Sequence, residues 1–139
     1  MKKYLVVVML IALGFLVALT QQIRSGYKNV IPAEVEKLMA EDSNVVLLDV
    51  RTKAEFESET GHLKGATLIP VQELEERVGE LDRYKDKTII AYCRSGQRSS
   101  FAASILQSRG FKVVNMTGGM LRWNAERRPV QREESKRNE

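Results

Sequence analysis

The feature that most constrains the fold of this chain is a regular alternation of short apolar runs with short amphipathic segments. The run 45–50 is apolar except for Asp49, and further β-like runs occupy residues 67–69, 88–92 and 112–115. Continuous apolar runs of this length are typical of strands in a sheet that is covered on both faces. The alternation predicts an α/β fold, in which a small parallel β-sheet is flanked by helices on both faces.

The segments between these runs carry the sequence signals of helices. Apolar residues with helical spacing occur in 32–39 and 74–81, and a further helical stretch begins near Phe101. Thr52 and Glu55 match a capping box, which predicts that a helix starts directly after the 45–50 strand.

The single cysteine, Cys93, directly follows the apolar run 88–92, where the predicted strand ends. In parallel sheets the functional groups lie beyond the carboxyl ends of the strands. Amide N–H groups of a tight turn, the positive end of a helix and guanidinium groups all favour a thiolate over a thiol. We therefore expect Cys93 to be a nucleophile at the mouth of the sheet. The commoner role of a lone cysteine among apolar residues is that of a small buried hydrophobe.

Length and charge exclude several classes of protein. The 139 residues suffice for one ordinary domain, and the net charge is only +4, with both signs interspersed along the chain. A nucleic-acid surface is therefore not expected. One cysteine cannot form an intrachain disulfide, and no residue spacing resembles a metal-ligand set.

The N-terminal segment is the second strong signal. Lys2 and Lys3 precede an uncharged, mostly apolar stretch that extends from Tyr4 to Leu19. We expect residues 1–22 to form a signal anchor or transmembrane helix, which is favoured over a cleaved signal peptide because no good cleavage site follows. The lysines should stay in the cytoplasm, which would place the domain on the extracytoplasmic, periplasmic side of the membrane. A cleaved and exported form is the second choice.

The remaining chain divides into three parts. Residues 23–30 are expected to be a linker, and 31–130 the α/β domain. Residues 131–139 are charged, lack apolar periodicity and are expected to be disordered.

From about residue 31 to 130 the chain resembles a single-domain rhodanese. The motifs that carry the resemblance are Leu48-Asp49-Val50-Arg51, Glu55-Phe56, Gly61 to Ala66, Ile69-Pro70, Tyr92 to Ser99, Gly118-Gly119 and Trp123. The resemblance implies a sulfurtransferase without a cofactor. Cys93 would take a sulfane sulfur from an anionic donor such as thiosulfate and pass it to cyanide, a thiol or a protein acceptor.

The residues after Cys93 fit this chemistry. Arg94 and Arg98 would attract and orient the donor anion, and Gly96 would permit the geometry of the turn. Three further residues have side chains that would either contact the substrate or cap the helix, namely Ser95, Gln97 and Ser99.

Three other residues are expected to be structural. Asp49 and Arg51 should form a mutual or loop-bracing salt bridge rather than act in catalysis. His62 is the only histidine, and we assign it to loop structure because an activated thiolate needs no general base.

Three other functions remain open. Rhodanese-like folds are shared with dual-specificity phosphatases, but their loop has five residues between cysteine and arginine, whereas Cys93 and Arg98 are separated by four. A non-catalytic, membrane-tethered binding module is disfavoured by the retained cysteine. A persulfide carrier that hands sulfur to a protein partner lies between these functions.

Overall fold

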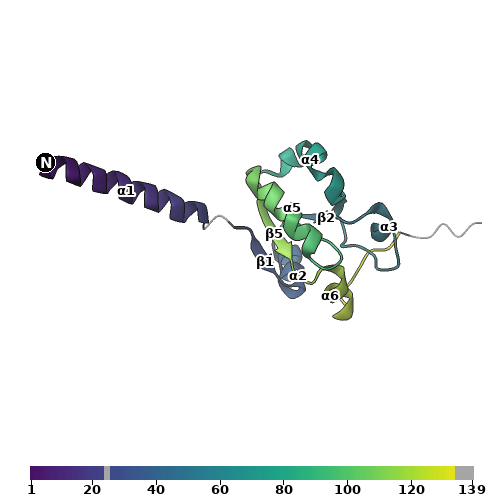
Figure 1. The fold of residues 1–139 in the computed structure, drawn as a ribbon. Coiled ribbons are helices and arrows are strands. Elements are labelled where there is room, and N and C mark those ends of the chain that lie inside the picture. The colour runs from purple at the N-terminus through teal and green to yellow at the C-terminus, as the bar shows by residue number, and fades with distance from the viewer. Residues whose placement is uncertain (24–25, 134–139) are drawn as a thin grey trace, which may run out of the picture.

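The computed structural model describes residues 1–23 and 26–133 (Figure 1). Five parallel strands form one sheet in the order β1-β5-β4-β2-β3. They are β1 (Lys28–Val30), β2 (Val45–Asp49), β3 (Thr67–Leu68), β4 (Thr88–Tyr92) and β5 (Lys112–Met116). The predicted parallel sheet is confirmed, and β4, the strand that precedes Cys93, lies at its centre.

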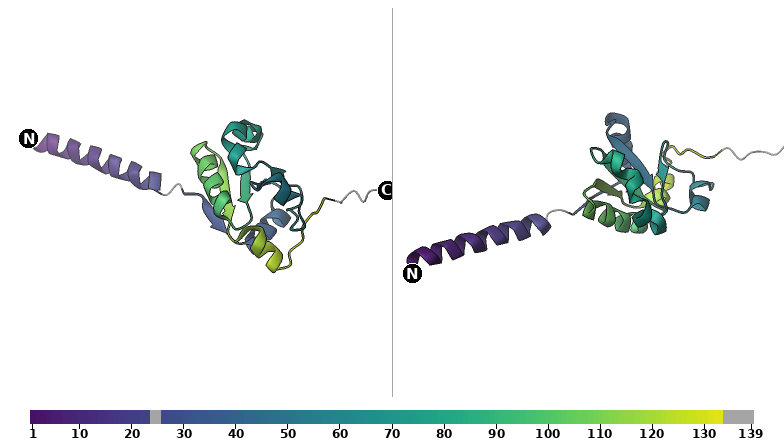
Figure 2. Two further views of the ribbon diagram at one scale, coloured as in Figure 1. Left: turned by 45° about the vertical axis from the view of Figure 1, so that its right-hand side comes forward. Right: turned by 90° about the horizontal axis from the view of Figure 1, so that it is seen from above.

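Helices cover both faces of this sheet, as predicted. They are α2 (Pro32–Glu41), α3 (Lys53–Phe56), α4 (Leu74–Arg77), α5 (Gln97–Ser108) and α6 (Gly119–Ala125), with 3-10 segments η1 (Val71–Glu73) and η2 (Val78–Tyr84). Helix α5 packs on one face beside the 71–84 segment, whereas α2 and α6 pack together on the other (Figure 2).

A hydrophobic core lies on each face of the sheet. Successive residues of β4 pack alternately into these two cores, because side chains of a strand alternate between faces. Ile89 and Ala91 pack in the core beneath α5. Ile90 and Tyr92 pack in the second core, which also contains Trp123 of α6. Burial on both faces explains why the run is apolar without interruption.

Two elements differ from the sequence-based expectation. Strand β1 lies within the segment 23–30 that was assigned to a linker; three residues are too few to show a strand pattern, and β1 forms by pairing with β5. The 74–81 pattern contains only one turn of α-helix and continues as the 3-10 segment η2. Gly79 lies in that segment, and glycine disfavours a regular helix.

The C-terminal segment also departs from expectation. Gln131 pairs with His62 through backbone hydrogen bonds of 2.9 and 2.8 Å, and Arg132 donates to the carbonyl of Glu59 at 2.8 Å. Residues 131–133 of the predicted disordered tail are therefore bound to the domain. Residues 134–139 lie outside the described part of the chain.

Helix α1 (Lys2–Ile23) extends away from the α/β domain (Figure 1). Its side chains from Lys3 to Leu16 are exposed. Within the described residues, we find no helix whose length and apolar character together would carry it across a membrane. The helix is present, but the predicted transmembrane span is not supported.

Candidate active site

Cys93 is the first residue after β4, and the chain then turns sharply into α5. Gly96 makes this turn possible, because its φ is +100°, a conformation that side-chain-bearing residues rarely adopt. A Cβ atom there would also lie 3.2 Å from the amide nitrogen of Gly118. The turn therefore needs glycine both for its backbone conformation and for its close packing against the segment before α6.

The sulfur of Cys93 accepts hydrogen bonds from this turn. The amide of Gly96 donates to Sγ over 3.0 Å, and the Ser99 hydroxyl lies 3.4 Å from it. Burial raises the pKa of the thiol, but hydrogen bonds from the Ser99 side chain and from the amides of Ser99, Gly96 and Ser95 outweigh it and lower the pKa below its ordinary value. The site therefore favours the thiolate.

Helix α5 begins at Gln97, earlier than the start near Phe101 expected from sequence. Gln97, Arg98 and Ser99 thus form its first turn, and the sulfur lies against the positive end of a twelve-residue helix. The apolar pattern missed this turn because its residues are polar. The helix dipole adds to the amide hydrogen bonds in favouring negative charge on the sulfur.

Cys93 is fully buried, with 0 % of its surface exposed. Its position directly after β4 is the one expected at the mouth of the sheet, but the loop that follows covers the sulfur. The hydrogen bonds that lower the pKa of Cys93 form only when the loop closes around the sulfur. The loop conformation that stabilises the thiolate therefore also buries it.

Helix α6 fixes the start of the loop. The amide of Met120 donates to the carbonyl of Cys93 at 2.9 Å, and the amide of Leu121 donates to that of Arg94 at 3.0 Å. Gly119 lies so close to both carbonyls that a Cβ atom would overlap them. The Gly118-Gly119 motif thus allows the first turn of α6 to hold the active-site loop.

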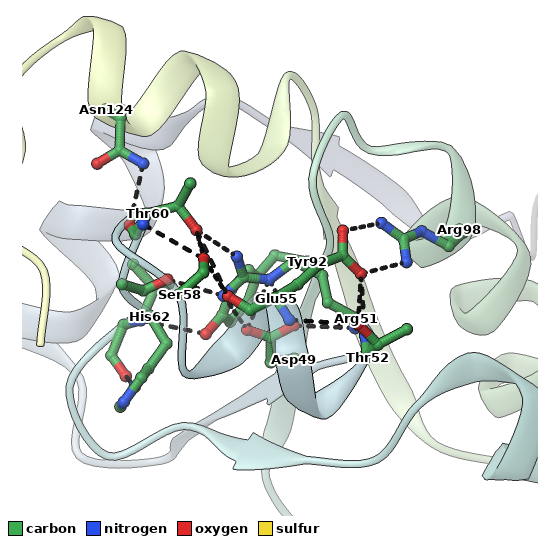
Figure 3. Close-up of polar contacts among 12 residues, drawn as sticks. Asp49, Arg51, Thr52, Glu55, Ser58, Thr60, His62, Tyr92, Arg98 and Asn124 are labelled. Carbon is green, nitrogen blue, oxygen red and sulfur yellow. Dashed lines mark hydrogen bonds and ion pairs between the residues drawn. The ribbon is translucent and has the colours of Figure 1, made fainter. Parts of the chain in front are cut away.

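The two arginines of the loop have different surroundings. Arg98 donates to both carboxylate oxygens of Glu55, over 2.7 and 2.8 Å (Figure 3). The Arg98 guanidinium is the main reason that the pKa of Glu55 falls to about 2. Arg94 is exposed, has no ion-pair partner within the described residues, and lines a hollow of about 210 Å³ together with Arg51 and Glu55. Of the two, Arg94 is the better placed to meet an anion.

Asp49 and Arg51 form a buried ion pair of 2.7 Å at the end of β2. Arg51 also donates to the hydroxyl of Thr60 at 3.1 Å and the carbonyl of Gly61 at 2.8 Å, so it fastens the loop after α3 (Figure 3). Tyr92 accepts a hydrogen bond from the amide of Leu63 at 3.1 Å, and burial raises the pKa of its phenol. Arg51 and Tyr92 therefore attach this loop to the sheet.

His62 is buried in the same loop. Its ring stacks on Phe56 with 3.7 Å between centroids, and its Nδ1 lies 3.1 Å from the carbonyl of Leu63. Its Nε2 faces a carboxylate oxygen of Glu133 at 3.5 Å. These contacts hold the loop in place, and none of them involves the sulfur of Cys93.

Sequence reasoning missed two residues of the site. Glu55 is expected from sequence to form a capping box, which it does with Thr52, and belongs to a motif of the resemblance, but its pairing with Arg98 was not predicted. Asn115 on β5 accepts a hydrogen bond from Ser99 at 2.6 Å. Pairs separated by 43 and 16 residues leave no local signal in one sequence. Within residues 1–23 and 26–133, no cluster of His, Cys, Asp and Glu is arranged to hold a metal.

Comparison with known proteins agrees with this geometry. Residues 31–126 match the family model described as the rhodanese-like domain. The putative sulfurtransferase YtwF of Bacillus subtilis is 34% identical over 102 residues, which cover 73% of this chain and 95% of that protein. The putative sulfur carrier protein YrkF of the same organism is 40% identical over 83 residues, covering 59% of this chain and 43% of its own.

A solved structure shares the fold. The rhodanese-related protein of Thermoplasma volcanium superposes with a TM-score of 0.69 at 29% identity, over 77% of this chain and all of that one. The segment matched by the family model, 31–126, includes β4, the loop and α5 that surround Cys93. The chain belongs to the rhodanese-like family.

Proposed function

We propose that this protein is a sulfurtransferase in which Cys93 carries the sulfur as a persulfide. The observation that supports this most directly is the sulfur's set of hydrogen-bond donors, the amide of Gly96 at 3.0 Å and the hydroxyl of Ser99 at 3.4 Å. The backbone amide of Gly96 is a fixed donor, which stabilises a thiolate without turning its hydrogen during the reaction. Relatives named as sulfurtransferases add weight to the same reaction.

The proposed reaction has two displacement steps. With thiosulfate as donor, the Cys93 thiolate attacks the outer sulfur, the sulfur–sulfur bond of the donor breaks, and sulfite leaves with the bonding electrons. An acceptor, cyanide or a thiolate, then attacks the outer sulfur of the persulfide, and the Cys93 thiolate is released. No electrons are gained or lost overall. No cofactor takes part in either step.

The loop and Arg94 supply the remaining requirements. Arg94 offers a guanidinium to the donor anion, whereas Arg98 is held by Glu55 and keeps the first turn of α5 in place. Ser95 and Gln97 line a hollow on another side of the loop, where their side chains would contact a substrate. Because Cys93 is buried, the loop opens before each displacement.

The test is persulfide formation. After treatment with thiosulfate, mass spectrometry of the wild-type protein should show one added sulfur atom on Cys93, and cyanide should remove it as thiocyanate. Cys93→Ser should form neither product. If the wild-type thiol stays unmodified after treatment with thiosulfate and with each of a set of other sulfur donors, the proposal is contradicted.

A persulfide carrier for a protein acceptor is the second candidate, because the putative sulfur carrier YrkF is among the relatives. It predicts that Cys93 becomes a persulfide but transfers sulfur slowly to cyanide and small thiols. A non-catalytic binding module predicts no persulfide at all. A phosphatase predicts hydrolysis of an aryl phosphate that depends on Cys93.

We also propose that α1 attaches the domain to a membrane, with the domain on the extracytoplasmic side. The exposed apolar side chains from Tyr4 to Leu16 and the lysines at its start support this. The test is protease treatment of intact spheroplasts that make the full chain. Digestion of the domain without lysis agrees with the proposal, and digestion only after lysis contradicts it. A soluble, processed protein in the periplasm would instead indicate cleavage.

A further inference from the structure

Asn115 is a buried polar residue next to the active-site loop, with 3% of its surface exposed. It lies on β5 directly beside Ala91 of β4. Its side chain has three hydrogen-bond partners: the hydroxyl of Ser99 at 2.6 Å, the side-chain oxygen of Asn29 at 3.0 Å and the carbonyl of Gly96 at 3.4 Å. This side chain therefore connects two neighbouring strands to the turn that holds the sulfur.

These partners determine which way the Asn115 amide points. The carbonyl of Gly96 can only accept a hydrogen bond, so the atom that faces it is the amide nitrogen, Nδ2. The oxygen, Oδ1, then faces Ser99. A carbonyl oxygen carries no hydrogen, so the Ser99 hydroxyl is the donor in this bond.

The same hydroxyl is the side-chain donor to the sulfur of Cys93, at 3.4 Å. A serine hydroxyl has one hydrogen, so it cannot donate fully to Asn115 and to the sulfur at once. While the hydrogen points to Asn115, Ser99 offers the sulfur only lone pairs, which suit a protonated thiol. A thiolate is stabilised when the Ser99 hydrogen turns towards it and forms a hydrogen bond. The hydrogen bond from Ser99 to Asn115 is then lost.

We propose that Asn115 is a positioning residue that regulates the reactivity of Cys93 by competing with its sulfur for the single hydroxyl hydrogen of Ser99. The proposal deepens the proposed function, because the sulfur concerned is the one that would carry the persulfide. The competition itself exists in the free protein and does not depend on any sulfur donor.

The competition matters for sulfur transfer because Cys93 has two opposite tasks. As attacking group it reacts faster when its thiolate is more basic, and as leaving group it departs faster when its thiolate is less basic. Asn115 withdraws one donor from the thiolate, and the Gly96 amide remains. The sulfur therefore keeps a basicity between those of a fully bonded and an unbonded thiolate.

The test measures the pKa of Cys93 by the ultraviolet absorbance of its thiolate across a pH series. Asn115→Ala frees the Ser99 hydrogen for the sulfur and should lower the pKa by about 0.5–1 unit. Ser99→Ala removes that hydrogen and should raise the pKa. The double variant should behave like Ser99→Ala, because without the hydroxyl there is nothing for Asn115 to compete for.

Asn29→Ala is the matched control. It removes another asparagine of the same network but leaves the bond between Asn115 and Ser99, so the thiol pKa should stay close to the wild-type value. The charged groups around the loop are unchanged in all of these variants: Asp49, Arg51, Glu55, Arg94 and Arg98.

The direction of the shift separates this role from a merely structural one. If Asn115 only held the loop together, Asn115→Ala would loosen the amide of Gly96 from the sulfur and raise the pKa. A raised or unchanged pKa would overturn the proposal. Persulfide formation is not needed for this measurement, so its failure would leave the result intact.

A second measurement uses the wild-type chain, in case Asn115→Ala does not fold. The side-chain amide resonances of Asn115 should shift as Cys93 titrates, because Oδ1 loses its donor when the thiolate forms. The shift should be absent in Cys93→Ser and much smaller in Ser99→Ala. Resonances that do not follow the titration in the wild type, or that follow it equally in Ser99→Ala, would overturn the proposal.

Discussion

Arg98 and Glu55 face each other with two parallel hydrogen bonds of 2.7 and 2.8 Å, although 43 residues separate them in the chain. The pair ties the first turn of α5, which carries the active-site loop, to the first turn of α3 (Figure 3). Bidentate geometry of this kind fixes orientation as well as distance. Arg98 is thereby a part of the loop's framework.

Glu55→Gln should therefore destabilise the domain at neutral pH. The pKa of Glu55 is lowered from 4.5 to about 2, a shift worth roughly 3 kcal/mol, which the partial exposure of the pair reduces to about 1–2 kcal/mol. Urea denaturation at pH 7 measures the loss. Glu80→Gln breaks an exposed bond to Arg77 and should change stability much less.

The effect of Glu55→Gln should also depend on pH in a definite direction. A folded-state pKa below the unfolded one gives stability that is fully present above about pH 4.5 and disappears as the pH falls to about 2. Wild type and variant should therefore converge in stability between pH 4.5 and pH 2. A difference that stays constant down to pH 2 would show that packing, not charge, accounts for the loss.

Arg51→Ala should be among the most destabilising substitutions in the sheet. It leaves the Asp49 carboxylate buried without its partner, which costs about 3–5 kcal/mol. Adding Asp49→Ala should recover part of this lost stability, because the buried, unpaired carboxylate is removed. Denaturant unfolding of both variants measures the coupling, and strictly additive losses would refute the charge-based explanation.

Gly119→Ala should disrupt the loop more than its backbone angle alone requires. Gly119 has φ +54° and a Cβ atom would overlap the carbonyls of Cys93 and Arg94. Gly65→Ala is the control, because Gly65 has φ +79° but open space around it. We expect a loss of about 1 kcal/mol for Gly65→Ala and about 3 kcal/mol or more for Gly119→Ala in unfolding experiments. Equal losses would mean that α6 can shift without cost.

The fold was largely predictable because its signals are local. The apolar runs at 45–50 and 88–92 are long enough to identify buried strands, and Cys93 follows the second one directly. By contrast, β1 has three residues and depends on pairing with β5, so no local pattern identifies it. Polar residues at the start of α5 concealed its first turn.

The site was less predictable because its partners come from different elements. The sequence placed a cysteine before a glycine-containing turn, but the roles of Glu55 and Asn115 depend on how α3 and β5 pack beside α5. Burial of the thiol also follows from tertiary packing. A single sequence shows which residues follow one another, whereas these contacts depend on which elements lie side by side.

Arg94 and Arg98 should consequently differ in their effects on catalysis. Arg94 lines the hollow beside the loop and has no ion-pair partner within the described part of the chain, so Arg94→Ala should raise the KM for thiosulfate with little change in stability. Arg98→Ala breaks the bond to Glu55, so it should lower stability by about 1–2 kcal/mol and thereby disturb the loop.

Steady-state kinetics with thiosulfate, at several salt concentrations, separate the two roles. The KM of the wild type should rise with salt because screening weakens the attraction between a guanidinium and an anion, and Arg94→Ala should lose most of this dependence. Arg83→Ala removes an exposed arginine that stacks on Tyr84 and serves as the control for overall charge. If Arg83→Ala raised the KM as much as Arg94→Ala, net charge rather than the position of Arg94 would govern donor binding.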